Sequence, residues 1–252
     1  MNVPITTGAN ISVSSLAIGD QGSGPGSSEL STPSPSSLPK VTASQSPEHA
    51  HRLAEVTSRA TLTDPLNILF QQDKTGSATP PTPNLLYKAA KGRMDTKIAA
   101  GSFIVEAGDF AAVACWEPPS ATPPPLTGEQ LDRLEHEKPI FGQFIRDVER
   151  IRQACLGPDQ QQYWTLSLMA RDPERKTKGA VRAVIQPYVA RAKQEKMPIW
   201  LVAGNARARD VYAYFGFRVV DTIWSYSKEK GDGDERAEGV PSWCMVCNWP
   251  PE

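Results

Sequence analysis

Tyr163-Trp-Thr-Leu-Ser-Leu-Met-Ala170 and Ile199-Trp-Leu-Val-Ala203 are the two apolar stretches that flank the segment deciding the fold. The first is predicted to be a strand because apolar and β-forming residues dominate it, and Asp172-Pro173 ends it. The segment between them carries one apolar helical face, at spacings of three and four residues, formed by Val181, Val184, Ile185, Tyr188, Val189 and Ala192. Pro187 is expected to kink this helix without ending it. Strand, helix and strand in this order predict a crossover unit.

The turn before the helix combines positive charge with a glycine. Arg175, Lys176 and Lys178 precede Gly179 at the point where a strand leads into a helix N-terminus. Unpaired backbone N–H groups, the helix dipole and these cations together suit a pyrophosphate. A solvated basic turn without a ligand is the alternative, and the turn alone does not decide between the two.

The residues after the second strand complete a recognisable order. Asn205 follows the strand, Tyr212 lies seven residues later, and Gly216-Phe217 follow four residues after that. With the preceding strand and turn, this order resembles the acyl-CoA-binding core of the GNAT superfamily of N-acetyltransferases. The match covers about residues 50–249 and is most specific over 163–220. It implies an α/β (α+β) fold with one twisted, mostly antiparallel sheet, helices on both faces and a splayed parallel strand pair for acetyl-CoA.

The final part of the chain narrows the resemblance. Pro241-Ser-Trp-Cys-Met245 is similar to the last strand of the puromycin N-acetyltransferase-like branch, and Pro187 and the long insertion before Tyr163 are similar to that branch and its fungal relatives. The expected function is therefore acetyl-CoA-dependent N-acetylation of a primary amine of a small molecule, a secondary metabolite or xenobiotic, in a ternary complex. A non-catalytic acyl-CoA-binding module and a protein N-acetyltransferase remain the alternatives.

The resemblance implies an acetyl-CoA site from three parts of this region. Residues 169–171 would pair with the pantetheine arm like an added strand, 176–181 would hold the pyrophosphate, and Asn205 would contact the pantetheine or the cofactor carbonyls. Asn205 is also a candidate helix N-cap. The chain departs from the family at Lys176, Thr177 and Val181, where Gln or Arg, Gly and a small residue are usual. The implied cofactor-binding residues are Met169, Ala170, Arg171, Lys176, Thr177, Lys178, Gly179, Ala180, Val181, Asn205 and Tyr212.

Two residues are the catalytic candidates. The spacing of Tyr212 matches the family tyrosine that protonates the departing CoA thiolate, and a buried helix aromatic is the alternative. Glu117 ends a predicted strand and is the candidate base for the ammonium proton, with a solvated strand end as the alternative. A backbone N–H near residues 169–171 is expected to stabilise the oxyanion.

The first 47 of the 252 residues are mostly Ser, Thr, Pro and Gly, with no aromatic side chain. They are predicted to form a disordered tail before a domain at 48–252, and residues 1–45 are expected to be dispensable, so that a chain starting near Ser46 keeps its stability. Helices are expected at 48–60, after Asp64-Pro65, at 129–137 and at 139–155; strands at 102–106, 110–116, 221–228 and 243–249; and loops at 74–83, 118–127 and 228–239.

Composition limits the partners. The absence of a long apolar run and of a targeting pattern favours a soluble, cytoplasmic protein with no membrane partner. A net charge of −1 does not indicate nucleic-acid binding. The tight pair Cys244-x-x-Cys247 would point to opposite faces of a strand, so no metal site is expected. The oligomeric expectation is a monomer or homodimer.

Overall fold

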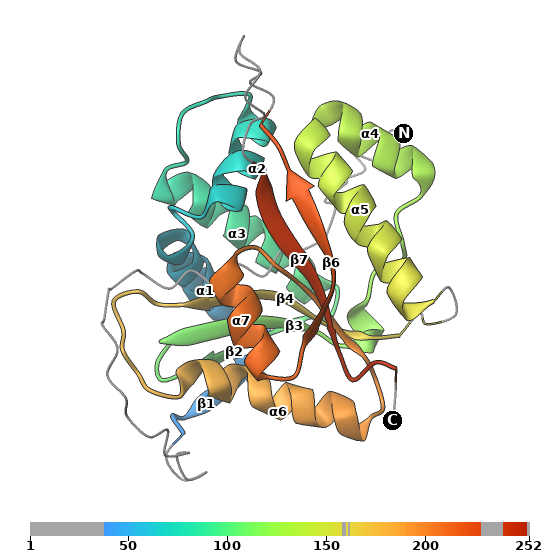
Figure 1. The fold of residues 1–252 in the computed structure, drawn as a ribbon. Coiled ribbons are helices and arrows are strands. Elements are labelled where there is room, and N and C mark those ends of the chain that lie inside the picture. The colour runs from blue at the N-terminus through green and yellow to red at the C-terminus, as the bar shows by residue number, and fades with distance from the viewer. Residues whose placement is uncertain (1–37, 158–159, 161, 228–238, 251–252) are drawn as a thin grey trace, which may run out of the picture.

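The computed structural model describes residues 38–157, 160, 162–227 and 239–250, and its centre is a seven-stranded sheet in the order β1-β2-β3-β4-β5-β7-β6 (Figure 1). The strands are β1 (Val41–Ser44), β2 (Phe103–Ala107), β3 (Ala112–Glu117), β4 (Trp164–Arg171), β5 (Ile199–Ala203), β6 (Arg218–Ser225) and β7 (Val240–Cys247). Neighbouring strands are antiparallel except for the parallel pair β4–β5. This arrangement confirms the predicted mixed α/β fold.

The helices begin at residues with a clear local reason. Ser46, Asp64 and Thr82 each accept a hydrogen bond from the backbone N–H three residues later, and each precedes a proline in the first helical turn. The helices are α1 (Pro47–Ala60), α2 (Pro65–Thr75), α3 (Pro83–Ala99), α4 (Gly128–Glu137), α5 (Pro139–Leu156), α6 (Ala180–Gln194) and α7 (Ala206–Tyr214), with a short 3-10 helix at Pro119–Ala121. Helix α6 continues through Pro187, as expected. Within the described residues, no helix is long and apolar enough to cross a membrane.

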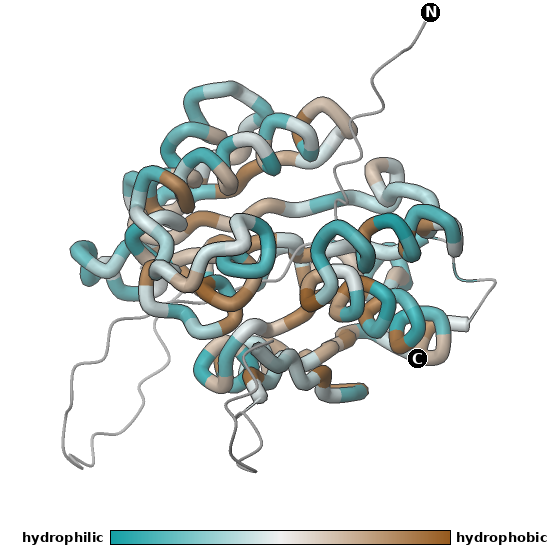
Figure 2. The backbone as a smooth tube through the Cα atoms, turned by 90° about the horizontal axis from the view of Figure 1, so that it is seen from above, coloured by the Kyte–Doolittle hydropathy of each residue, from teal (hydrophilic) through white to brown (hydrophobic). Residues whose placement is uncertain are grey.

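Helices cover both faces of the sheet, because successive strand residues alternate between two cores. On one face, α6 and α7 pack on residues such as Leu201 and Met245. On the other, α1 and α3 pack over β2–β4, and α4 and α5 pack over β5–β7. Cys244 and Cys247 lie in cores on opposite faces, as their spacing predicted. Figure 2 shows the hydrophobic segments gathered between the helices.

Where strands β3 and β4 pair, β4 contains one residue more than β3. Cys115 pairs with Leu168 and Trp116 pairs with Leu166, so Ser167 forms a β-bulge. Such a bulge bends and twists its strand locally. On its other side, β4 is registered with β5 at Trp164 and Thr165, and the register ends two residues before the bulge residue Ser167. We attribute the divergence of β4 from β5 to this bend.

One α-helix and one strand were not predicted, nor was the short 3-10 helix in the expected loop 118–127. Helix α3 lacks an apolar stripe, because its buried face includes Lys97 among Leu86, Ala90 and Met94. Strand β1 has four residues and pairs with β2, so the expectation of disorder through residue 47 is wrong for this segment. A truncation at Ser46 would remove that edge strand. Residues 1–37 of the expected tail and residues 228–238 of the expected loop lie outside the described residues.

Candidate functional site

The parallel pair opens into a splay beyond its first two residue pairs. After Thr165, β4 remains paired with β3, where Met169 faces Ala114 and Arg171 faces Ala112, while the registered pairs with β5 end. The edge of β4 that faces β5 therefore presents backbone groups that a ligand could pair with. Met169 and Ala170 are buried. Residues 169–171, the segment predicted to pair with the pantetheine arm, lie on the β4 side of this splay.

The basic turn leads from β4 into α6 as predicted. Gly179 has φ 81°, a left-handed conformation that favours glycine, and caps α6 without a side-chain hydrogen bond. The first amides of α6 thus lack a side-chain acceptor within the described residues. Lys176 and Lys178 are exposed beside them, and Ala180 is buried. Positive charge and backbone donors meet at this turn, so it can hold an anion.

Two neighbours contact the turn. A Cβ atom added to Gly108 would lie 2.8 Å from Thr177 Cγ2, so the turn packs closely on the β2–β3 hairpin. A Cβ atom added to Gly179 would lie 3.2 Å from Leu38 Cδ2. The segment before β1 therefore lies against the glycine whose backbone the cofactor is expected to approach.

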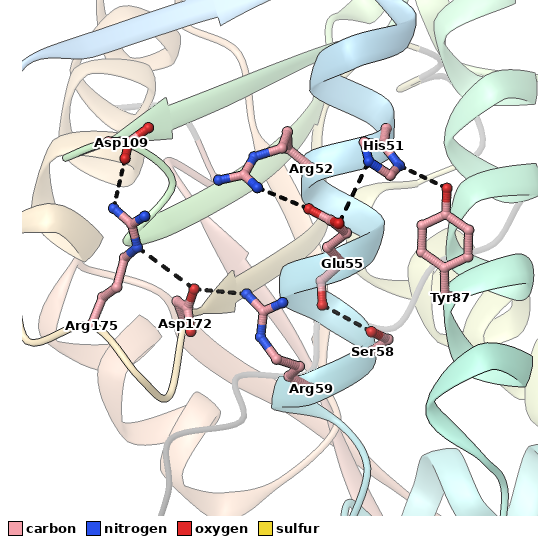
Figure 3. A network of polar contacts seen from close by, with 9 residues as sticks. All are labelled: His51, Arg52, Glu55, Ser58, Arg59, Tyr87, Asp109, Asp172 and Arg175. Carbon is pink, nitrogen blue, oxygen red and sulfur yellow. Dashed lines mark hydrogen bonds and ion pairs between the residues drawn. The ribbon is translucent and has the colours of Figure 1, made fainter.

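Arg175 belongs to an ion-pair network instead of standing open to solvent (Figure 3). Its Nη1 lies 2.8 Å from Asp109 Oδ2, and its Nε lies 3.9 Å from Asp172 Oδ2. Arg59 on α1 donates to the same Asp172 oxygen at 2.8 Å, and Asp172 is buried. The network joins α1, the end of β4 and the hairpin. It stabilises the start of the basic turn, and it leaves Lys176 and Lys178 as the more accessible cations.

Asn205 links the end of β5 to the α1–α2 loop. Its Oδ1 accepts from Ala208 N at 2.9 Å, which makes it the N-cap of α7, and its Nδ2 donates to Asp64 Oδ2 at 2.9 Å. Asp64 Oδ1 accepts from Asn67 N at 3.0 Å. Burial raises the pKa of Asp64, against the lowering effect of these hydrogen bonds. The sequence indicates the Asn205 cap, but not the contact of Asn205 with Asp64.

Asp64→Asn is expected to lower the free energy of unfolding by about 1–2 kcal/mol, because the new amide would face the Asn205 amide, donor against donor. Because the folded-state pKa of Asp64 is raised, its protonated form favours folding, and that contribution is lost as the pH rises through the folded pKa. The stability difference between the parent and the variant should therefore be largest in acid. Urea unfolding at a series of pH values measures it. A difference that grows toward neutral pH would contradict this assignment.

Tyr212 is fully buried in α7, and its hydroxyl oxygen is buried as well. Its ring lies 5.9 Å from the Phe217 ring, centroid to centroid. Its carbonyl oxygen accepts from the Phe215 and Phe217 amides, which fixes the turn after α7. Tyr212 is thus a core aromatic in this structure, and its role as a proton donor stays a prediction.

Glu117 is buried at the end of β3, so it is not a solvated strand end. Lys97 Nζ donates to Glu117 Oε1 at 2.6 Å, and the two side chains are 1% and 6% exposed. Burial lowers the pKa of the nearby Arg93, opposed by the charges of Cys115 and Glu117. Burial also raises the pKa of Cys115 to about 11. Sequence reasoning missed Lys97 and Arg93 because both lie on the unpredicted helix α3.

Two yeast proteins are similar in sequence to part of this chain. No family model matches the chain. An uncharacterized protein of Saccharomyces cerevisiae is 29% identical over 149 residues, 57% of this chain and 60% of that protein. An uncharacterized N-acetyltransferase of Schizosaccharomyces pombe is 25% identical over 130 residues, 48% of this chain and 53% of that protein. The chain therefore spans only part of the length of these relatives.

Solved structures match most of the chain at low identity. Arylalkylamine N-acetyltransferase 2 from Aedes aegypti has a TM-score of 0.53 and 15% identity, covering 82% of this chain and 97% of that structure. The C-terminal condensation domain of Ebony, in complex with β-alanyl-dopamine, has a TM-score of 0.54 and 12% identity, covering 83% and 99%. The chain thus has the fold of the GNAT N-acetyltransferases, and the Ebony domain shares it.

Proposed function

We propose that this chain transfers the acetyl group of acetyl-CoA to a primary amine of a small molecule. The observation that carries the proposal is the splay of β4 from β5, followed by the basic N-terminus of α6. The naming of one relative as an N-acetyltransferase and the fold shared with an arylalkylamine N-acetyltransferase support the reaction class. The puromycin-like branch and a role in secondary metabolism remain predictions of the sequence resemblance.

The proposed reaction is direct attack in a ternary complex. A neutral amine adds to the thioester carbonyl carbon, and a backbone N–H near Met169–Arg171 donates to the oxyanion. The C–S bond then breaks and Tyr212 donates a proton to the CoA thiolate. The attacking nitrogen loses one proton, which restores the Tyr212 hydroxyl, so a neutral amide and the CoA thiol leave. The edge of β4 that holds these amides is also the edge expected to align the pantetheine arm.

Two carboxyl groups are candidates for the base that removes the ammonium proton. Glu117 is the candidate from the sequence, but its carboxylate is engaged by Lys97 in a buried pair, which proton uptake would break. Asp64 lies beside Asn205 at the carboxyl end of β5, and burial raises its pKa. A carboxyl group with a raised pKa accepts a proton more readily near neutral pH. Asp64 therefore joins Glu117 as a candidate base.

Mass spectrometry of reactions with acetyl-CoA and a panel of arylalkylamines, polyamines and peptides tests the function directly. We expect an acetylated small amine. Acetylation of peptides alone would favour a protein N-acetyltransferase. Saturable acetyl-CoA binding without turnover on any amine would favour a non-catalytic acyl-CoA-binding module. The full burial of Tyr212, the proposed proton donor, is consistent with that alternative.

Lys176→Glu/Lys178→Glu is expected to weaken acetyl-CoA binding about tenfold or more, because two exposed cations beside the α6 N-terminus become anions facing a pyrophosphate. The loss should shrink at high salt, since both positions are exposed. Isothermal calorimetry measures both effects. Lys88→Glu, an exposed charge reversal on α3, is the matched control. Unchanged affinity in the double variant would place the pyrophosphate elsewhere.

Leu38→Ala tests in the same calorimetric experiment whether the segment before β1 affects acetyl-CoA binding at the turn. Leu38 lies against Gly179, so removing its side chain opens the approach to the glycine backbone. Acetyl-CoA affinity should stay the same or rise in this variant. A fall would show that Leu38 belongs to the binding site.

A further inference from the structure

A cavity of about 570 Å³ lies at the end of α6 that is remote from the basic turn. The last turns of α6, the α7–β6 connection and the end of β7 form its walls, and Figure 1 shows these segments meeting at the edge of the sheet. Helix α6 has 15 residues, so its two ends lie about 20 Å apart at 1.5 Å per residue. The cavity is therefore distinct from the proposed cofactor turn. Its volume is in the range of small-molecule sites.

The charged side chains that line this cavity are all cationic. They are Lys193, Lys196 and Arg218, and no carboxylate is among the described residues of the lining. Arg218 donates to the Trp249 carbonyl oxygen at 2.9 Å, which fixes its guanidinium at the wall. Glu195 lies between the two lysines in sequence, but it accepts from Arg191 and from Trp164 Nε1. The cavity thus favours an anion.

Asn248 provides a second, independent indication. Its Nδ2 atom is buried and makes no hydrogen bond within the described part of the chain. On the other side of this amide, Cys247 Sγ donates to Asn248 Oδ1 at 3.5 Å. A buried donor without an acceptor is costly, so such a group in a cavity wall calls for a ligand acceptor.

The rest of the wall is mainly apolar. Phe215 and Trp249 are among its apolar residues, and both are partly exposed. An inorganic anion would satisfy the cations and the amide but would leave these side chains against water. A ligand with an apolar body would cover them and gain the free energy of burial.

We propose that this cavity binds a small organic anion, a carboxylate or phosphate monoester attached to an aromatic ring or short apolar chain. The anionic group accepts from Asn248 Nδ2 and lies near Lys193 and Lys196, and the apolar body contacts Phe215 and Trp249. The proposal does not rest on the acetyltransferase function, because none of these residues belongs to the proposed cofactor site.

Calorimetric and NMR titrations of the full chain test the site with benzoate, phenyl phosphate, inorganic phosphate and the neutral analogue benzamide. Benzoate or phenyl phosphate should bind saturably and shift the Asn248 side-chain amide resonances, and whichever binds tighter identifies the head group. Benzamide and inorganic phosphate should bind at least about tenfold more weakly. Saturating acetyl-CoA should not displace the bound anion. Displacement, equal binding of benzamide, or no saturable binding of either organic anion would overturn the proposal.

Variants separate the site from nonspecific charge. Lys193→Gln/Lys196→Gln should weaken binding about fivefold, as expected for two partly solvated charge contacts. Asn248→Asp is nearly isosteric and suits the positive φ of 57° at this position, but it replaces the donor with a carboxylate, so the loss should reach about tenfold or more. Lys88→Gln, an exposed α3 change, should leave binding unaltered. Thermal unfolding checks that each variant folds, and unchanged affinity in both site variants would refute the assignment.

Discussion

Replacing Lys97 with methionine is expected to lower the free energy of unfolding by about 3–5 kcal/mol. The Lys97–Glu117 pair is 2.6 Å long and nearly sealed from water, so the variant leaves the Glu117 carboxylate buried without its closest cation. Loss of packing is small, because methionine retains most of the lysine stem. Chemical denaturation at neutral pH measures the change.

The double variant Lys97→Met/Glu117→Leu is the control for this prediction. It removes both charges and keeps apolar volume, and replacing a buried pair in this way is often nearly neutral. We therefore expect the double variant to be more stable than Lys97→Met alone. Equal losses in the two variants would show that packing on α3, and not the ion pair, determines the effect.

Tyr212→Phe is expected to reduce turnover with acetyl-CoA and an active amine by about 10²-fold, the lower end of the contribution of general acids. The acetyl-CoA dissociation constant should change little, because the ring and its contact with Phe217 remain. The physical reason is that the departing thiolate loses its proton donor while the core keeps its shape. Single-turnover kinetics and calorimetry measure the two quantities separately.

Tyr163→Phe is the matched comparison for Tyr212→Phe. Tyr163 is also a buried tyrosine, but it packs in the core on the α4–α5 face. Burial raises the pKa of Tyr163 to about 12, so its phenol stays protonated at neutral pH. This variant should lose stability without losing turnover. If Tyr212→Phe behaves the same way, Tyr212 is a core aromatic and the proposed donor role is wrong.

The sequence by itself determined the features that depend on short segments. Apolar periodicity placed β4, α6 and β5, and Gly179 marked the turn between β4 and α6. Asn205 was recognised as a cap, and the structure confirms that cap. These features follow from local preferences, because helix caps, left-handed glycines and residue spacing act within a few residues along the chain.

The tertiary structure alone decided which of these groups meet. Asp64 and Asn205 are 141 residues apart, and Lys97 and Glu117 lie on different elements, yet each pair is in hydrogen-bond contact. Helix α3 escaped prediction because its buried face includes Lys97, whose burial makes sense only beside Glu117. The bulge at Ser167 could not be predicted either, because a bulge is defined by the pairing of its strand with the partner strand. Contacts between distant segments depend on the packing of the whole sheet, which no local pattern encodes.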